Sequence, residues 1–159
     1  MPFVALIIAA LVVAADQIIK YFVAANIKPV GTVTVIDGVF NLSYVENRGV
    51  AFGMFKDMRW IIVALTTLLV FAIAFYMFKK RPDGKLFYIL AGLIIGGGIG
   101  NLIDRILYGY VIDYLSLSFF PPVCNFADYC ITGGVIVLAV YMLFKPSGKK
   151  KKVSKNDKS

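Results

Sequence analysis

The sequence GNLIDRILYGYVIDYLSLSFFPPVCNFAD, residues 100–128, holds three of the nine carboxylates of the chain: Asp104, Asp113 and Asp128. It lies between two strongly apolar segments that are typical of membrane-spanning helices. Ionisable side chains beside lipid are energetically costly and commonly mark functional sites. The stretch therefore predicts a polar site at a membrane surface, with the rest of the chain as its scaffold.

The composition indicates an integral membrane protein. Of the 159 residues, 60% are hydrophobic and the mean hydropathy is +0.81, whereas soluble domains contain about 45–50% apolar residues. The net charge of +8 is concentrated, since residues 149–158 carry six of the seventeen basic residues and residues 79–85 carry four more. Beside membrane spans, such runs are typical of cytoplasmic flanks, so we expect no nucleic-acid partner.

Four apolar segments have the length and composition of membrane spans. They cover about residues 3–25, 60–78, 86–105 and 125–144. The fold class is therefore an α-helical integral membrane protein. We expect one membrane-embedded domain over residues 1–145 and a basic polar tail over residues 146–159.

Two regions outside these spans differ in character. Residues 28–57 contain two β-rich runs around the turn signal Asp37-Gly38, which predicts a small hairpin or sheet outside the lipid. Residues 106–123 contain Gly109 and two consecutive prolines and are predicted to form a loop.

The distribution of basic residues predicts the topology. Four spans place both termini on one side of the membrane. The 79–85 loop and the tail are strongly basic, while residues 106–123 contain no Lys or Arg. Both termini are therefore predicted to be cytoplasmic, and the polar groups near the span ends fall in the outer half.

The absence of histidine restricts the chemistry. It excludes Ser-His-Asp and Cys-His catalysis and most zinc sites. Cys124 and Cys130 fit no metal or redox spacing and are predicted to be unpaired thiols. A divalent-metal site would have few oxygen ligands, so we expect neither a metal nor another cofactor.

The carboxylates divide into two groups. Asp16 lies one helical turn from Lys20, which favours a structural ion pair over a direct catalytic role. Asp104 is adjacent to Arg105, its expected neutralising partner. Asp113 and Asp128 have no basic residue within seven positions.

Two unpaired carboxylates suit an aspartyl pair that shares one proton and activates water for peptide hydrolysis. The same pattern also fits a proton or ion pathway in a small transporter, or structural polar contacts. Spacing alone leaves these alternatives open.

Five motifs carry a resemblance to a known family. They are Asp16-Gln17-x-x-Lys20, Asn47-Arg48-Gly49-Val50-Ala51-Phe52, Gly100-Asn101-Leu102-Ile103-Asp104-Arg105, Gly109-Tyr110-Val111-Ile112-Asp113-Tyr114 and Asn125-Phe126-Ala127-Asp128. Over about residues 3–145, the chain resembles lipoprotein signal peptidase (signal peptidase II), a family of bacterial membrane aspartic peptidases. Small departures from its pattern occur at Tyr114, Cys124 and Tyr129.

The resemblance implies an endopeptidase that removes signal peptides from diacylglyceryl-modified prolipoproteins, cutting before the lipidated cysteine. It implies Asp113 and Asp128 as the catalytic pair, with the outer hairpin and residues 49–55 as a substrate cradle and a mobile arm. The other matching positions are Asn47, Gly49, Asn101, Arg105, Asn125 and Ala127, with Asp16 and Lys20 in a supporting role. Arg105 and Asn47 are candidates to hold polar groups, with an Arg105–Asp104 pair as the alternative for Arg105.

The resemblance also implies partners and a location. The partners are the lipidated prolipoprotein and membrane lipid. The location is the bacterial cytoplasmic membrane, with the active site at its outer face. We expect a monomer, because the site lies within one chain.

Overall fold

The computed structural model describes residues 1–49, 55 and 57–144. The described residues form the helices α1 (Pro2–Asn26), α2 (Arg59–Lys80), α3 (Lys85–Leu107) and α4 (Phe126–Phe144). Each is long and apolar enough to cross a membrane, which confirms the predicted spans. The 146–159 tail and most of the 49–55 stretch lie outside the described residues, and the single-domain boundary stays a prediction.

Helix α3 is the central element of the bundle, because it packs against each of the other three helices. Its glycines make this possible. A Cβ atom on Gly96 would lie 2.8 Å from the backbone oxygen of Ala9 in α1, and one on Gly97 would lie 2.6 Å from that of Ala127 in α4. Small residues at helix contacts let backbones approach closely in a membrane, where lipid already solvates apolar side chains.

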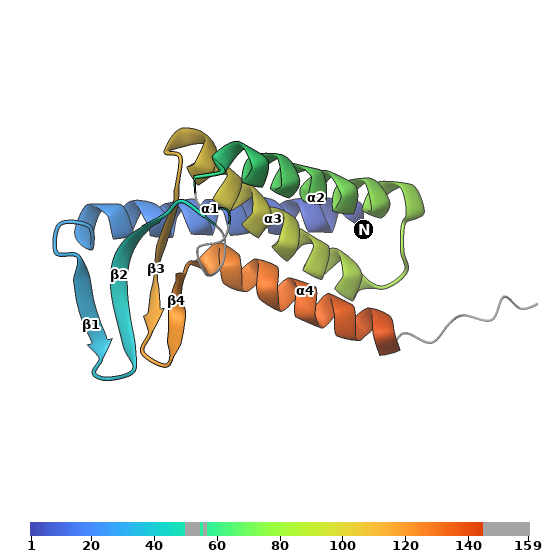
Figure 1. Ribbon diagram of the computed structural model, residues 1–159. Helices are drawn as coiled ribbons and strands as arrows, with labels where there is room; N and C mark the ends of the chain where they lie inside the picture. The colour runs from blue at the N-terminus through green and yellow to red at the C-terminus, as the bar shows by residue number, and fades with distance from the viewer. Residues whose placement is uncertain (50–54, 56, 145–159) are drawn as a thin grey trace, which may run out of the picture.

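A four-stranded antiparallel sheet lies at one end of the bundle (Figure 1). Its strands are β1 (Thr32–Ile36), β2 (Phe40–Asn47), β3 (Val111–Leu117) and β4 (Phe120–Cys124), in the spatial order β1-β2-β3-β4. The β1–β2 hairpin is the one that the sequence predicts. The end of α3, the start of α4 and the end of α1 all lie at this sheet end of the bundle.

The prediction that residues 106–123 form a loop is wrong, because most of these residues form the β3–β4 hairpin. The alternating pattern of Val111–Leu117 is a strand signal, but Gly109 and the two prolines hide it. Gly109 adopts φ +87° where the chain leaves α3. The prolines lie in β4, an edge strand, where a missing N–H donor does not interrupt a ladder.

The register between β2 and β3 brings Asn47 close to Asp113, two residues of the candidate site. Val45 of β2 pairs with Asp113 of β3, and Asn47 pairs with Val111. A register irregularity between Leu42 and Val45 precedes these pairs. The end of β2 therefore runs beside the Asp113 backbone.

The α3–α4 contact gives a stability prediction. Gly97→Ala places a methyl group within 2.6 Å of the Ala127 backbone oxygen, so the helices must separate. We expect a loss of about 1–3 kcal/mol, measured as a lower Tm in detergent. The matched control is Gly133→Ala in α4, where a new Cβ meets no atom within 4 Å. An equal Tm for the two variants would contradict close packing at Gly97.

Candidate active site

Asp113 and Asp128 come from different elements and are joined by Asn125. Asp113 lies on β3, and Asp128 lies in the first turn of α4. The side-chain amide of Asn125 donates to Asp113 Oδ1 at 2.6 Å. Asn125 therefore links the strand that carries one carboxylate to the helix that carries the other.

The start of α4 also orients Asp128 through reciprocal capping bonds. The backbone N–H of Asp128 donates to Asn125 Oδ1 at 2.9 Å, and the backbone N–H of Asn125 donates to Asp128 Oδ2 at 3.1 Å. This is the geometry of a capping box, in which two helix-start donors are satisfied by side chains. The Asn125–Asp128 motif thus fixes the Asp128 side chain by local helix chemistry.

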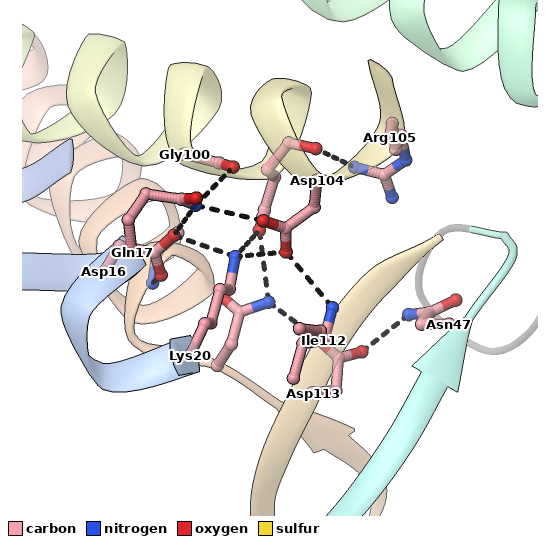
Figure 2. A network of polar contacts seen from close by, with 12 residues as sticks. Asp16, Gln17, Lys20, Asn47, Gly100, Asp104, Arg105, Ile112 and Asp113 are labelled. Atoms are coloured by element: carbon pink, nitrogen blue, oxygen red, sulfur yellow. Dashed lines mark hydrogen bonds and ion pairs between the residues drawn. The ribbon is translucent and has the colours of Figure 1, made fainter. Parts of the chain in front are cut away.

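Asn101 of α3 completes the contacts between the carboxylates. Its Nδ2 donates to Asp128 Oδ1 at 2.8 Å, while its Oδ1 accepts from Asn125 Nδ2 at 3.2 Å. On the other side, Asn47 Nδ2 donates to Asp113 Oδ2 at 2.8 Å (Figure 2). Each carboxylate therefore accepts two hydrogen bonds from neutral donors, and neither has an ion-pair partner among the described residues.

The environment of Asp113 favours its protonated form. Its side chain is only 1% exposed. Burial, together with the negative charge of Asp128, raises the pKa of Asp113 to about 7, while hydrogen bonds from Asn47 and Asn125 limit the rise. A carboxyl group that titrates near neutrality is suited to acid–base catalysis.

Behind the two aspartates lies a buried ionic cluster around Lys20. The Lys20 ammonium lies 2.8 Å from Asp16 Oδ2 and 2.8 Å from Asp104 Oδ2. It also donates to Asn101 Oδ1 at 2.9 Å. The Asp16–Lys20 pair agrees with the i,i+4 prediction, and Figure 2 shows Lys20 at the centre of the network.

The carboxylates of this cluster also hold the backbone beside each aspartate of the pair. Asp104 Oδ2 accepts the Ile112 N–H at 3.1 Å, next to Asp113 in the chain. Asp16 Oδ1 accepts the Ala127 N–H at 3.2 Å, next to Asp128. The cluster therefore fixes the positions of both Asp113 and Asp128.

Gln17 also takes part in the cluster, although the charge pattern of the sequence does not predict this. Its side-chain amide donates to Asp16 Oδ2, to Asp104 Oδ1 and to the Gly100 carbonyl, at 3.0–3.2 Å. Its place in the first motif was the available signal. Gln17 bridges the two carboxylates that share Lys20.

The expected pairing of Asp104 with Arg105 is wrong. Asp104 pairs with Lys20, which is 84 positions away in sequence. Arg105 instead donates from Nη2 to the Gly49 carbonyl at 2.8 Å and from Nη1 to the Asn101 carbonyl at 3.4 Å. Adjacent residues on a helix point in different directions, so sequence proximity was a poor guide to pairing.

Arg105 and Asn47 together anchor the chain at Gly49. The Gly49 carbonyl accepts from Arg105, and the Gly49 N–H donates to Asn47 Oδ1 at 2.9 Å. Asn47 thereby bonds both Asp113 and the Gly49 backbone. These contacts fix the start of the 49–55 stretch beside the two aspartates.

Tyr114 connects β3 to the start of α4. Its hydroxyl accepts the backbone N–H of Phe126 at 3.2 Å, which satisfies a donor at the start of α4. Burial raises the pKa of Tyr114 to about 12. Cys124 is half-buried and Cys130 is buried, and both are free thiols, as predicted.

A cavity of about 1010 Å³ opens beside the pair. Six of the ten predicted site residues line it: Asn47, Gly49, Asn101, Arg105, Asp113 and Asp128. The other four, Asp16, Lys20, Asn125 and Ala127, are buried next to it. Its remaining wall comes from α2, β4 and α4, where it is largely apolar, and from the end of β2, where Glu46 and Arg48 line it.

The carboxyl groups of Asp113 and Asp128 belong to residues that line the same cavity. Among the described residues, no group of three or more His, Cys, Asp or Glu side chains could hold a metal ion. Two carboxylates that lack cationic partners and face one cavity can share a proton and polarise a water molecule.

Comparisons with known proteins agree with the fold. A family model described as signal peptidase (SPase) II matches residues 8–144. A lipoprotein signal peptidase of Caldanaerobacter subterraneus subsp. tengcongensis is 43% identical over 89% of this chain and 97% of its own length. That of Clostridium acetobutylicum is 38% identical over 93% and 99%. A bacterial membrane enzyme solved by the in meso method superposes with a TM-score of 0.83, at 30% identity, over 95% of this chain and 94% of the other.

The ionic cluster gives a second stability prediction. Lys20→Met leaves two buried carboxylates without their cation, so we expect a loss of about 3–5 kcal/mol, measured as a lower Tm in detergent. Lys20→Met combined with Asp16→Asn should recover part of this loss, because it removes one uncompensated charge. A double variant no more stable than Lys20→Met would show that charge balance is not what holds the cluster together.

Proposed function

The chain belongs to the signal peptidase II family, and we propose from this premise that it is an aspartic endopeptidase for diacylglyceryl-modified prolipoproteins. Family membership makes it a peptidase that processes prolipoprotein signal peptides. The observation that supports the aspartic mechanism is the meeting of Asp113 and Asp128 in one cavity, with neutral amide donors on both. No observation on the described residues favours the transporter alternative.

In the proposed mechanism, the two aspartates share one proton. The ionised carboxylate takes a proton from water, and the resulting nucleophile attacks the scissile carbonyl carbon. The protonated carboxyl group polarises the carbonyl oxygen and later supplies the proton that the leaving amine needs. The pKa of about 7 for Asp113 makes it the suitable holder of the shared proton.

The surrounding residues have supporting roles in this proposal. Asn47, Asn101 and Asn125 orient the carboxylates through their amide donors. Arg105 holds the Gly49 backbone and lines the cavity. Asp16 and Lys20 act at one remove, since Asp16 fixes the Ala127 N–H and Lys20 holds Asn101.

The position of the pair suits a substrate anchored in lipid. Asp128 lies in the first turn of a membrane helix, so the proposed reaction takes place near the membrane surface. A lipidated cysteine would hold the preceding peptide bond at that height. We therefore place the cut before the lipidated cysteine.

Topology and assembly complete the proposal. Basic residues flank the ends of α2 and α3 that lie away from the sheet, at Lys79, Lys80 and Lys85. By the positive-inside rule these ends are cytoplasmic, so both termini are cytoplasmic and the cavity opens at the outer face of the bacterial inner membrane. We propose a monomer, because one chain supplies every residue of the site.

The catalytic assignment predicts that Asp113→Asn and Asp128→Asn each reduce cleavage of a diacylglyceryl-modified prolipoprotein by at least about 10³-fold, because either change replaces a carboxyl group that must take up or supply a proton by an amide that can do neither. The assay uses purified protein in detergent, with unlipidated substrate in parallel. Asp83→Asn, between α2 and α3 at the end of the bundle away from the sheet, is the control and should cleave normally. Cleavage that survives either active-site substitution would overturn the pair, and failure of wild type to cut would overturn the substrate assignment.

The raised pKa of Asp113 predicts the pH dependence. Below about pH 7 Asp113 holds its proton, and above it the proton is lost, so kcat/KM should fall as the pH rises through about 7. The Asn47 hydrogen bond lowers the pKa of Asp113, so Asn47→Ala should move this falling limb to higher pH. Asn41→Ala on the same strand is the control. If the fall in kcat/KM occurs at the same pH in Asn47→Ala as in wild type, the titration of Asp113 does not cause it.

A further inference from the structure

Two threonines line the cavity that contains the aspartate pair. Thr66 is on α2 and Thr132 is on α4, and both line the cavity. Their neighbours on these walls, Ile62 and Ile131, are apolar. The threonines therefore place polar groups in the part of the cavity that otherwise suits hydrocarbon.

The two hydroxyls lie at similar depth. Thr66 follows the first residue of α2 by seven positions, and Thr132 follows the first residue of α4 by six. Both helices begin at the end of the bundle that carries the sheet (Figure 1). At 1.5 Å per residue, both threonines are about 9–11 Å along their helices. The two threonines therefore lie at about the same depth on two different helices, and we call this depth the threonine level.

This level is one helical turn from the aspartate pair. Thr132 follows Asp128 by four positions on α4, which is about 6 Å along the helix axis. Among the described residues, neither threonine hydroxyl has a hydrogen-bond partner, whereas the side-chain amides around the pair all donate to the two carboxylates or to another amide. Thr66 is half-buried and Thr132 is exposed. Once the lipid of a substrate fills the cavity and excludes water, both hydroxyls gain from a partner that this lipid supplies.

We propose that Thr66 and Thr132 donate hydrogen bonds to the ester carbonyls of the diacylglyceryl group of the substrate. This inference rests on the proposed function, because the scissile bond is placed at Asp113 and Asp128. The ester carbonyls lie several bonds beyond that peptide bond, through the cysteine side chain and the glycerol. They lie between the glycerol and the acyl chains, so we expect them at the depth of the two threonines when the acyl chains occupy the apolar part of the cavity.

The consequence is selectivity for an ester-linked lipid. A dialkylglyceryl ether has the same chain length and shape but lacks both carbonyls. A site that donates hydrogen bonds disfavours an analogue that leaves its donors unpaired. The threonines therefore distinguish an ester-linked lipid from an ether-linked one, while the aspartates act on the peptide bond.

The test compares two synthetic lipopeptides that span the cleavage site and differ only in diacyl ester or dialkyl ether linkage. Wild type should show a KM about three- to tenfold lower for the ester substrate, as expected for one or two hydrogen bonds. Thr66→Val combined with Thr132→Val should raise KM for the ester to the ether value, with kcat unchanged. The isosteric change removes only the hydroxyls.

Two further variants control for packing. Thr67→Val removes a hydroxyl from the adjacent residue of α2, which is exposed and does not line the cavity, and it should keep the wild-type preference. Thr66→Ser with Thr132→Ser keeps both donors and should also keep it. Equal KM values for the two substrates in wild type, or an ester preference that survives the double valine variant, would overturn the inference. Wild type that cuts neither lipopeptide would instead overturn the proposed function.

Discussion

The buried ammonium group of Lys20 is the contact on which the geometry of the site depends. It balances Asp16 and Asp104 and also bonds Asn101. Each of these partners then holds one part of the aspartate pair: Ala127 beside Asp128, Ile112 beside Asp113, and the Asp128 carboxylate itself. Burying three ionised groups adds little net stability. Their role is to fix the distances between α1, α3, β3 and the start of α4.

Lys20 and Arg105 do not contact the carboxylates of Asp113 and Asp128 directly, and the chemistry of hydrogen-bond donors explains why. A Lys or Arg in contact with Asp113 or Asp128 would favour the ionised form and lower its pKa. The nearest donors are amides and backbone N–H groups, which orient a carboxylate with a smaller effect on its charge. Lys20 and Arg105 act through Asn101 and Gly49 instead. The site thus combines rigid orientation with a carboxyl group that can hold a proton near neutral pH.

Sequence reasoning found the spans and the two unpaired aspartates, because hydropathy and local charge carry both signals. It failed where the answer depends on tertiary contacts. The sequence predicts that Asp104 pairs with its neighbour Arg105, whereas the packing of α1 on α3 places Asp104 beside Lys20. The sequence also predicts a loop where β3 lies, because Gly109 and the prolines of β4 mask the alternation of the strand. The register irregularity of β2, which brings Asn47 to Asp113, has no sequence signature of its own.

The order of the elements along the chain has a consequence for biosynthesis. Lys20 is on the first span, Asp113 is on the hairpin that follows the third, and Asp128 is on the fourth. A chain emerging from the ribosome completes its ion cluster only after three spans, and gains its second carboxylate with the last. The proposed peptidase is therefore inactive until the whole bundle has been inserted. If the proposed mechanism holds, a nascent chain that has not yet received Asp128 cannot hydrolyse its neighbours in the membrane.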